Sequence, residues 1–223
     1  MTAIFAIRHP QTTWNVESRY QGSLEAPWSK LGQEQARLLV RAFEGSPTDA
    51  VYTSPLERAA GLAREIASAT DAPMEADDRL REIGLGVWQG LQRGEIERRY
   101  PEMFRDWYTR PEIVSFPGGE TLGEVACRTQ DAISDIVRNY PAGNVVIVSH
   151  SAVIGSMVLA SLGLELNALH RIRLANGGIT TLCGESAPGT LLSLNVTDVL
   201  YRSPVVAAAQ QNCSTWKERA LSL

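Results

Sequence analysis

Two of the three histidines follow apolar runs that are typical of buried strands. His9 comes directly after the run AIFAI and Arg8, and His150 comes directly after VVIV and Ser149. In open α/β sheets, ligands bind in the crevice beyond the carboxyl ends of the strands. If both runs form central parallel strands, the two imidazoles face the same crevice. This placement makes His9 and His150 candidates for chemistry at one site.

Charged side chains lie where they could join the same crevice. Arg8 precedes His9, Arg58 lies near the start of a predicted helix, and Glu82 precedes a glycine-rich stretch. An arginine buried beside a histidine is costly unless an anion balances the two. Planar guanidinium groups bind phosphoryl oxygens through two parallel hydrogen bonds. The residues therefore indicate a phosphate cradle around a nucleophile.

The sequence around these residues resembles the histidine phosphatase superfamily, in the branch that includes cofactor-dependent phosphoglycerate mutases. The matching stretches, in the family's order, are RHPQTTWN, YQGSLEAPWSKLGQEQA, YTSPLERAAGLA, LREIGLGVWQG, FPGGETLGEV and VVIVSHSAVI. They run from residue 4 to about residue 185. One such match could arise by chance, whereas six in order point to the family.

The resemblance implies an α/β fold of the phosphoglycerate mutase type. Its three layers (α/β/α) enclose a mostly parallel sheet with an antiparallel edge. It also implies a two-step phosphoryl transfer that needs no metal and no cofactor. By match to the motifs, His9 is the nucleophile that becomes phosphohistidine, and Glu82 is the general acid/base. Three further residues are expected to bind the phosphate and stabilise the transition state: Arg8, Arg58 and His150. Four are expected to contact phosphate or substrate: Asn15, Gln21, Gly22 and Ser151.

Departures from the mutase pattern favour a phosphatase that acts on a small phosphorylated metabolite. In the mutases the acid lies in a Glu-Arg-His-Tyr-Gly context that a longer insertion follows. Here Ile83, Gly84 and Leu85 follow Glu82, and no histidine lies nearby. We therefore expect water as the phosphoryl acceptor, with a mutase-type phosphotransferase as the alternative.

Two other classes of function compete with this interpretation. Two histidines and a carboxylate also resemble an iron-binding facial triad, but Arg8 and Arg58 would repel a divalent cation, so no metal is expected. A catalytically weak binding module on the same fold is suggested by Pro10 and Ser151, which replace glycines of the family. Proline fixes φ and lacks an N–H donor. Every reactive side chain is nevertheless present, so we expect an enzyme.

The substrate is not readable from the sequence. Residues 84–120 contain five arginines that either bind a second anionic group of the substrate or are solvated and paired with acidic residues: Arg93, Arg98, Arg99, Arg105 and Arg110. Three tryptophans either line the entrance or pack the loops: Trp14, Trp28 and Trp88.

Strand and helix patterns alternate along the chain, which is typical of a parallel sheet with crossover helices. Strands are predicted at 3–7, 50–52, 143–150, 171–175, 178–183 and 190–196, with Gly177-Gly178 as a hairpin turn. Helices are predicted at 31–43, 121–139 and 151–162, and another begins near residue 53, capped by Thr53 or Ser54 with Pro55 in its first turn. Residues 1–197 are expected to form one domain, with a substrate cap or a plain surface insertion at about 84–120 and a C-terminal tail at 198–223.

Composition and charge restrict the kinds of partner that the protein can bind. The chain has 223 residues and a net charge of −4, which gives none of the basic excess expected of a nucleic-acid-binding protein. No apolar run is long enough to span a membrane, and no secretory signal is recognisable. Three widely spaced cysteines argue against structural zinc and favour free thiols in a reducing, cytoplasmic compartment. The oligomeric state stays open, with a dimer as one option.

Overall fold

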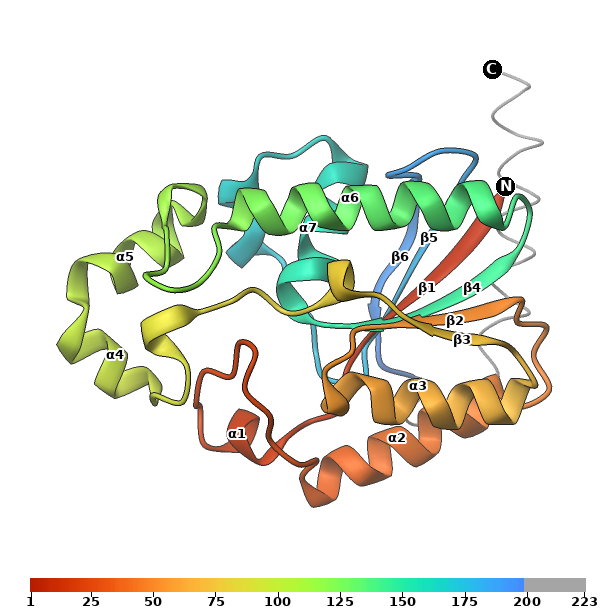
Figure 1. Ribbon diagram of the computed structural model, residues 1–223, viewed down its shortest axis with the longest axis horizontal. Coiled ribbons are helices and arrows are strands. Elements are labelled where there is room, and N and C mark those ends of the chain that lie inside the picture. The colour runs from red at the N-terminus through yellow and green to blue at the C-terminus, as the bar shows by residue number, and fades with distance from the viewer. Residues whose placement is uncertain (199–223) are drawn as a thin grey trace.

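One six-stranded sheet organises residues 1–198, the part of the chain that the computed structural model describes (Figure 1). Its strands are β1 (Thr2–Arg8), β2 (Ala50–Thr53), β3 (Met74–Ala76), β4 (Asn144–Ser149), β5 (Ile179–Gly184) and β6 (Thr190–Val196). The spatial order is β3-β2-β4-β1-β5-β6. Strands β3, β2, β4 and β1 run parallel, whereas β5 pairs antiparallel with β1 and β6 with β5. The predicted parallel sheet with an antiparallel edge is confirmed.

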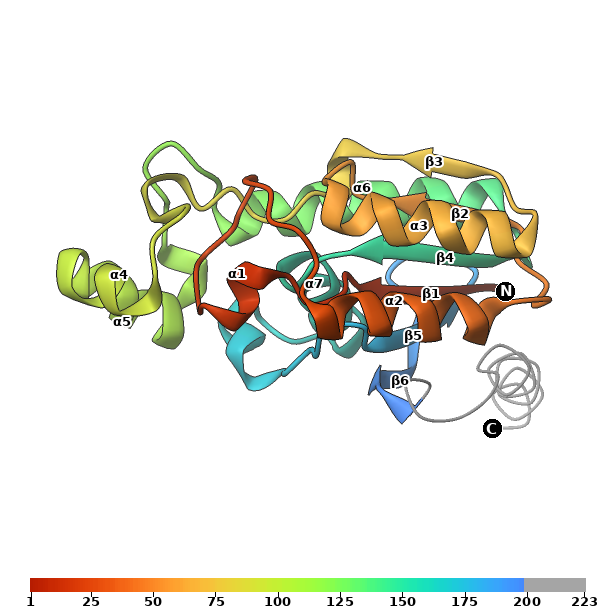
Figure 2. The same ribbon diagram turned by 90° about the horizontal axis from the view of Figure 1, so that it is seen from below.

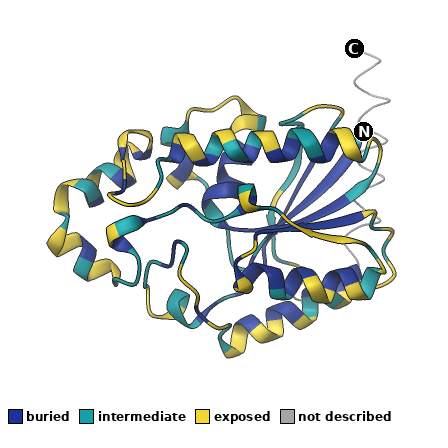
Figure 3. Cartoon of the chain, in the orientation of Figure 1, coloured by how far each residue is buried: buried dark blue, intermediate teal, exposed yellow. Residues whose placement is uncertain are grey.

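Helices cover both faces of the sheet and make three layers (Figures 1 and 2). Helices α2 (Lys30–Phe43) and α3 (Glu57–Thr70) lie on one face, and α6 (Leu122–Asn139) and α7 (Ser151–Leu162) on the other. This arrangement explains the continuous apolar runs of β1 and β4, because strands of a doubly covered parallel sheet are buried on both sides. The central strands are accordingly dark blue in Figure 3.

Successive residues of β1 point into different cores. Phe5 and Ile7 pack with α2 and α3, whereas Ile4 and Ala6 pack with α6 and α7. The alternation follows from the two-residue period of a strand. Both cores hold β1 in place, so the residues that follow its carboxyl end have a fixed position.

Residues 84–120, called the cap segment here, add no strand to the sheet. They contain α4 (Arg93–Arg99) and α5 (Pro101–Thr109), flanked by the short helices η2 (Gly86–Trp88) and η3 (Pro111–Ile113). The segment lies beyond the carboxyl ends of the parallel strands (Figure 1). Its rings pack on one another, with the centroid of Phe116 at 4.9 Å from Trp88 and 5.1 Å from Trp107. The cap segment therefore contains an aromatic cluster, which joins the core on the α6 side.

The predicted strand at 171–175 and its hairpin at Gly177-Gly178 are wrong. A short helix, η4 (Leu166–Arg171), occupies part of this region, and the hairpin lies instead between β5 and β6. The reason is that this loop binds the end of β1. The Arg8 backbone N–H donates to the Gly178 carbonyl, and the Gly177 N–H donates to the Arg8 carbonyl.

Two further local predictions need correction. Helix α3 begins at Glu57 with Leu56 at its N-cap position and no side-chain cap, so Thr53 and Ser54 do not cap it and Pro55 precedes it. The Ser54 hydroxyl is used elsewhere, as described below. Strand β3 was not predicted because its three residues are all exposed and show no apolar pattern. A small helix, α1 (Thr13–Val16), and the short helix η1 (Asp78–Leu80) complete the fold.

The described cysteines differ in burial. Cys127 is free, as predicted, and exposed, whereas Cys183 is buried. The cytoplasmic location stays a prediction. Within residues 1–198, no helix has the length and hydropathy needed to cross a bilayer. The predicted tail at 198–223 lies, apart from its first residue, outside the described residues.

Candidate active site

The two candidate histidines meet where β1 and β4 end. The strands are parallel neighbours with Arg8 in register with Ser149, so His9 and His150 follow at the same level. Their ring centroids are 5.1 Å apart, and their exposed fractions are 2% and 0%. The two imidazoles therefore meet at the strand ends as predicted, although only His9 lines the cavity described below. The chain leaves β1 toward α2 on one face and β4 toward α7 on the other, and such a switch point opens a crevice.

The hydrogen bond of His9 fixes its tautomer. Its Nδ1 lies 2.8 Å from the Pro10 carbonyl oxygen, and because a carbonyl only accepts, Nδ1 carries the hydrogen. The lone pair is then on Nε2, the atom that could attack phosphorus. Burial, reinforced by the charges of Arg8 and Arg58, holds the pKa of His9 well below its ordinary value of 6.5. The imidazole is therefore neutral and nucleophilic at neutral pH.

Arg58 is buried, and its guanidinium donates hydrogen bonds to backbone carbonyls of the loop that precedes α2. Its Nη2 donates to the Gly22 carbonyl over 2.6 Å, and its Nη1 donates to the Leu24 carbonyl over 2.8 Å. Gly22 has a φ of +53°, and a Cβ at this position would collide with the Gln89 side chain. Gly22 is thus required to turn its carbonyl toward the guanidinium, which explains the family's glycine at this place.

The two buried guanidinium groups keep donors to spare. Arg8 donates from Nη1 to the Leu174 carbonyl over 2.6 Å. The Nε atoms of both Arg8 and Arg58 have no hydrogen-bond partner among residues 1–198. Burial lowers the pKa of each, but a guanidinium stays protonated in proteins, so both are charged at neutral pH. Glu25 is the acidic ion-pair partner of Arg58, at 3.8 Å from its Nη1. Unused charged donors indicate an anion site.

His150 is the N-cap residue of α7, and a serine holds its ring. His150 Nε2 lies 2.8 Å from the Ser54 hydroxyl oxygen, which also accepts from the Leu56 backbone N–H. Its Nδ1 is buried and has no partner within the described part of the chain. Burial, then the charge of Arg58, holds the pKa of His150 well below 6.5. Ser54 was missed as a site residue, although it lies in the stretch YTSPLERAAGLA.

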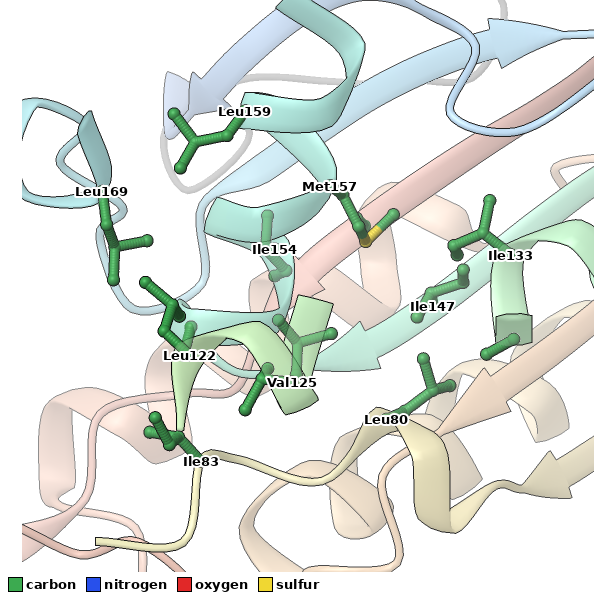
Figure 4. Packing of buried hydrophobic residues seen from close by; sticks show 14 of the residues in the cluster. Leu80, Ile83, Leu122, Val125, Ile133, Ile147, Ile154, Met157, Leu159 and Leu169 are labelled. Carbon is green, nitrogen blue, oxygen red and sulfur yellow. The ribbon is translucent and has the colours of Figure 1, made fainter. Parts of the chain in front are cut away.

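Glu82 is held by the first turn of α7. Its Oε1 accepts from the Ala152 N–H over 3.1 Å, and its Oε2 accepts from the Ser151 hydroxyl over 3.1 Å. Free N–H groups at a helix N-terminus bind carboxylates well. The neighbours Leu80 and Ile83 anchor the chain around Glu82 in the core on the α6 and α7 side (Figure 4). Ser151 thus contacts the proposed acid, a role that the sequence did not indicate.

Asn15 and Gln21 reach the site from the loop after β1. Asn15 Oδ1 accepts from the Thr12 backbone N–H over 3.0 Å and from Asn176 Nδ2 over 3.2 Å. The same Nδ2 of Asn176 donates to the His9 carbonyl. Gln21 is buried, and its Oε1 has no partner among the described residues. Asn176 was not singled out, because one asparagine in a loop gives no pattern to read.

One cavity of about 370 Å³ joins these groups. All the predicted site residues line it except His150, which lies behind the wall: Arg8, His9, Asn15, Gln21, Gly22, Arg58, Glu82 and Ser151. Its distal part is lined by rings and cations: Trp14, Arg19, Tyr20, Arg93, Trp107, Tyr108 and His170. Of the three tryptophans, Trp14 is at the cavity, whereas Trp28 binds the Arg58 carbonyl and Trp88 is in the core. Within residues 1–198, no group of three or more histidine, cysteine or acidic side chains is placed to hold a metal ion.

Known proteins of similar sequence or structure include phosphatases and a probable phosphoglycerate mutase. The sequence is 34% identical over 197 residues to phosphoserine phosphatase 1 of Hydrogenobacter thermophilus, covering 88% of this chain and 93% of that protein. It is 29% identical to GpmB of Enterobacter sp. (strain 638), which is named a probable phosphoglycerate mutase, covering 84% and 87% of the two chains. Mycobacterial glucosyl-3-phosphoglycerate phosphatase has a similar structure, with a TM-score of 0.78, 28% identity and coverage of 87% of this chain and 99% of that one.

The family assignment rests on the whole folded region. The family model of the histidine phosphatase superfamily (branch 1) matches residues 4–197, which include both histidines, both buried arginines and Glu82. The chain belongs to the histidine phosphatase superfamily, branch 1.

Proposed function

We propose that this protein hydrolyses a phosphomonoester of a small metabolite through a phosphohistidine formed on His9. The observation that carries the proposal is the His9 tautomer. The Pro10 carbonyl accepts a hydrogen bond from Nδ1–H, so Nε2 carries the lone pair, and His9 lines the cavity. Beside it, Arg8 and Arg58 keep unpaired Nε donors for the oxygens of a phosphoryl group.

The reaction divides into two displacements. In the first, the Nε2 lone pair of His9 forms a bond to phosphorus while the bond to the ester oxygen breaks. Protonated Glu82 gives its hydrogen to that leaving oxygen, which departs as an alcohol. In the second, a water oxygen attacks phosphorus, Glu82 takes a water proton, and the P–N bond breaks to release inorganic phosphate. In each step the protein contributes mainly by positioning the reacting groups and by stabilising the charge of the transition state.

The remaining predicted residues have supporting roles in this proposal. Arg8, Arg58 and His150 stabilise the charge on the equatorial oxygens, because fixed donors in a water-poor site act strongly on developing charge. Asn15, Gln21, Gly22 and Ser151 shape the loops that contact phosphate or substrate. The cap segment covers the substrate beyond the strand ends. Relatives named phosphoserine phosphatase and glucosyl-3-phosphoglycerate phosphatase support hydrolysis as the reaction.

A mutase-type transfer is the second candidate because of the similarity to GpmB. It would use the same phosphohistidine but return the phosphoryl group to an organic acceptor. Incubation with a phosphorylated hydroxy acid separates the two: a phosphatase releases inorganic phosphate in proportion to substrate lost, whereas a mutase yields an isomer.

The test of the proposal compares wild type with His9→Ala on p-nitrophenyl phosphate, together with mass spectrometry of acid-sensitive phosphoryl adducts. We expect hydrolysis and a phosphorylated His9 in the wild type and neither in the variant. Equal rates for both proteins would remove His9 from the mechanism. No hydrolysis by either, with retained binding of inorganic phosphate, would indicate a binding module.

A further inference from the structure

The five arginines of the cap segment differ in position, and one belongs to the cavity. Arg105 and Arg110 both pair with one aspartate, at 3.2 Å. Arg98 and Arg99 are exposed, as Arg93 is, but they do not line the cavity. Arg93, at the start of α4, lines its distal part. The open question of whether these arginines serve the substrate therefore reduces to Arg93.

Aromatic rings hold the Arg93 guanidinium at the cavity. Its Cζ lies 5.3 Å from the ring centroid of Phe104 and 5.1 Å from that of Tyr108. The Tyr108 hydroxyl in turn lies 2.6 Å from the hydroxyl of Tyr20, which ties α5 to the loop after β1. Cation–π contacts orient a guanidinium without cancelling its charge. Among residues 1–198, no carboxylate lies within ion-pair distance of Arg93.

The charges along the cavity are unbalanced at the Arg93 end. Glu82 is the only acidic residue in the described lining, and it is held by α7 at the catalytic end. Arg19 also lines the cavity, but it pairs with Glu17 at 3.0 Å. A bound phosphoryl group would engage the buried arginines near His9. The charge of Arg93 would stay uncompensated.

The third histidine supplies no second positive charge there. The His170 ring packs at 4.8 Å from Tyr108 and 5.1 Å from Trp107 between centroids. Burial lowers the pKa of His170, so it is neutral at neutral pH. Among the described lining residues, the distal part of the cavity thus offers one unpaired cation, several rings and a neutral imidazole.

We propose that Arg93 forms a second anion subsite and that the enzyme selects phosphorylated hydroxy acids over phosphorylated amino acids. This inference rests on the proposed phosphatase function. A carboxylate of the substrate would bind the guanidinium through charge-assisted hydrogen bonds. An ammonium group beside that carboxylate would be repelled by Arg93 and would find no carboxylate in the distal lining to balance it. The preference therefore differs from the substrate in the name of the Hydrogenobacter relative.

Three substrates that differ by one group at a time test the proposal. 3-Phosphoglycerate carries a carboxylate and a hydroxyl group. O-Phosphoserine has an ammonium group in place of the hydroxyl, and glycerol 3-phosphate lacks the carboxylate. We expect the kcat/KM of wild type for 3-phosphoglycerate to exceed each of the other two by at least about tenfold, the lower end of the range for a charge-assisted hydrogen bond.

The Arg93→Gln variant assigns the preference to this side chain. Its ratio of kcat/KM for 3-phosphoglycerate to that for glycerol 3-phosphate is expected to fall by at least about tenfold, mainly through KM, and Arg93→Lys should restore part of it. Arg98→Gln, on the same helix but outside the cavity lining, is the matched control and should keep the wild-type ratios. Preference for O-phosphoserine, or an Arg93→Gln variant with unchanged ratios, overturns the proposal.

These experiments distinguish failure of the Arg93 subsite from failure of the proposed phosphatase function. Hydrolysis of p-nitrophenyl phosphate with no preference among the three substrates rejects the subsite alone. If no ester is hydrolysed, the proposed function fails, and dissociation constants of the three compounds for the wild-type protein, measured by calorimetry, still decide the subsite. Equal dissociation constants would reject it, and tighter binding of 3-phosphoglycerate would support it.

Discussion

The Ser151 hydroxyl donates a hydrogen bond to the Glu82 carboxylate over 3.1 Å. Ser151 stands where the family motif has glycine, so this contact involves a side chain that the motif does not supply. The other oxygen of Glu82 accepts from the Ala152 N–H. The first turn of α7 therefore holds both oxygens of the proposed acid, and Ser151 acts as a positioning residue for Glu82.

The effect on kcat of removing this contact should depend on the leaving group of the substrate. In Ser151→Gly we expect kcat for an alkyl phosphate to fall by about threefold to tenfold, the range of one lost hydrogen bond, because an alkoxide needs the proton from Glu82 to depart. The rate with p-nitrophenyl phosphate should change little, since nitrophenolate leaves without it. Ser151→Thr keeps the hydroxyl and should restore the alkyl phosphate rate. Equal losses on both esters would argue for a general structural role.

Pro10 contributes to the site through its carbonyl, which glycine also has. The Nδ1 hydrogen bond of His9 should therefore survive in Pro10→Gly, and we expect the hydrolysis rate to change by less than about tenfold, a limit set by one hydrogen bond. The free energy of unfolding should fall by about 0.4–1 kcal/mol, because glycine has more freedom in the unfolded chain. Stopped assays and urea titration measure the two. A hundredfold faster variant would show instead that proline had suppressed catalysis.

Ser54 is expected to matter for both stability and activity through His150. The Ser54→Ala variant leaves the buried Nε2 of His150 without its partner, which should cost about 1–3 kcal/mol of unfolding free energy and lower kcat/KM. Ser156→Ala is the matched control, because Ser156 is also buried but its hydroxyl binds a carbonyl within α7. Wild-type activity in the Ser54→Ala protein would show that the position of His150 is not needed for phosphate binding.

The sequence predicted the elements whose apolar pattern is strong. The runs before Arg8 and Ser149 are continuous because β1 and β4 are covered on both faces, and their ends place the two histidines. The same reasoning failed at 171–175, where the apolar residues line the cavity and pack beside it instead of forming a strand. Nothing local to that segment reveals that Leu174 accepts a hydrogen bond from Arg8.

Contacts between distant loops were also beyond the sequence. Asn176 touches both the His9 carbonyl and Asn15, and Ser151 touches Glu82. Each contact depends on the position of two segments that only the completed sheet brings together. The motifs predicted the candidate reactive residues, whereas the residues that position them could be identified only from the structure.

The buried neutral histidines predict how stability depends on pH. His9 and His150 have pKa values well below 6.5 in the folded protein, mainly because of burial, whereas in the unfolded chain each titrates near 6.5. Below that pH the unfolded state binds more protons, so acid favours unfolding. Stability should therefore be constant above about pH 7 and fall by up to about 1.4 kcal/mol per pH unit for each histidine below 6.5.

Urea titrations between pH 7.5 and about pH 5 test this slope above the range of ordinary carboxylates, which titrate near pH 4. His9→Gln removes one titrating group while keeping a side chain that can donate to the Pro10 carbonyl, so the slope below 6.5 should become shallower by up to about 1.4 kcal/mol per pH unit. Lys30→Gln, at an exposed position, should keep the wild-type slope. A His9→Gln protein with the same slope as wild type would mean that His9 is protonated in the folded state. It could not then be the neutral nucleophile that the phosphohistidine mechanism needs.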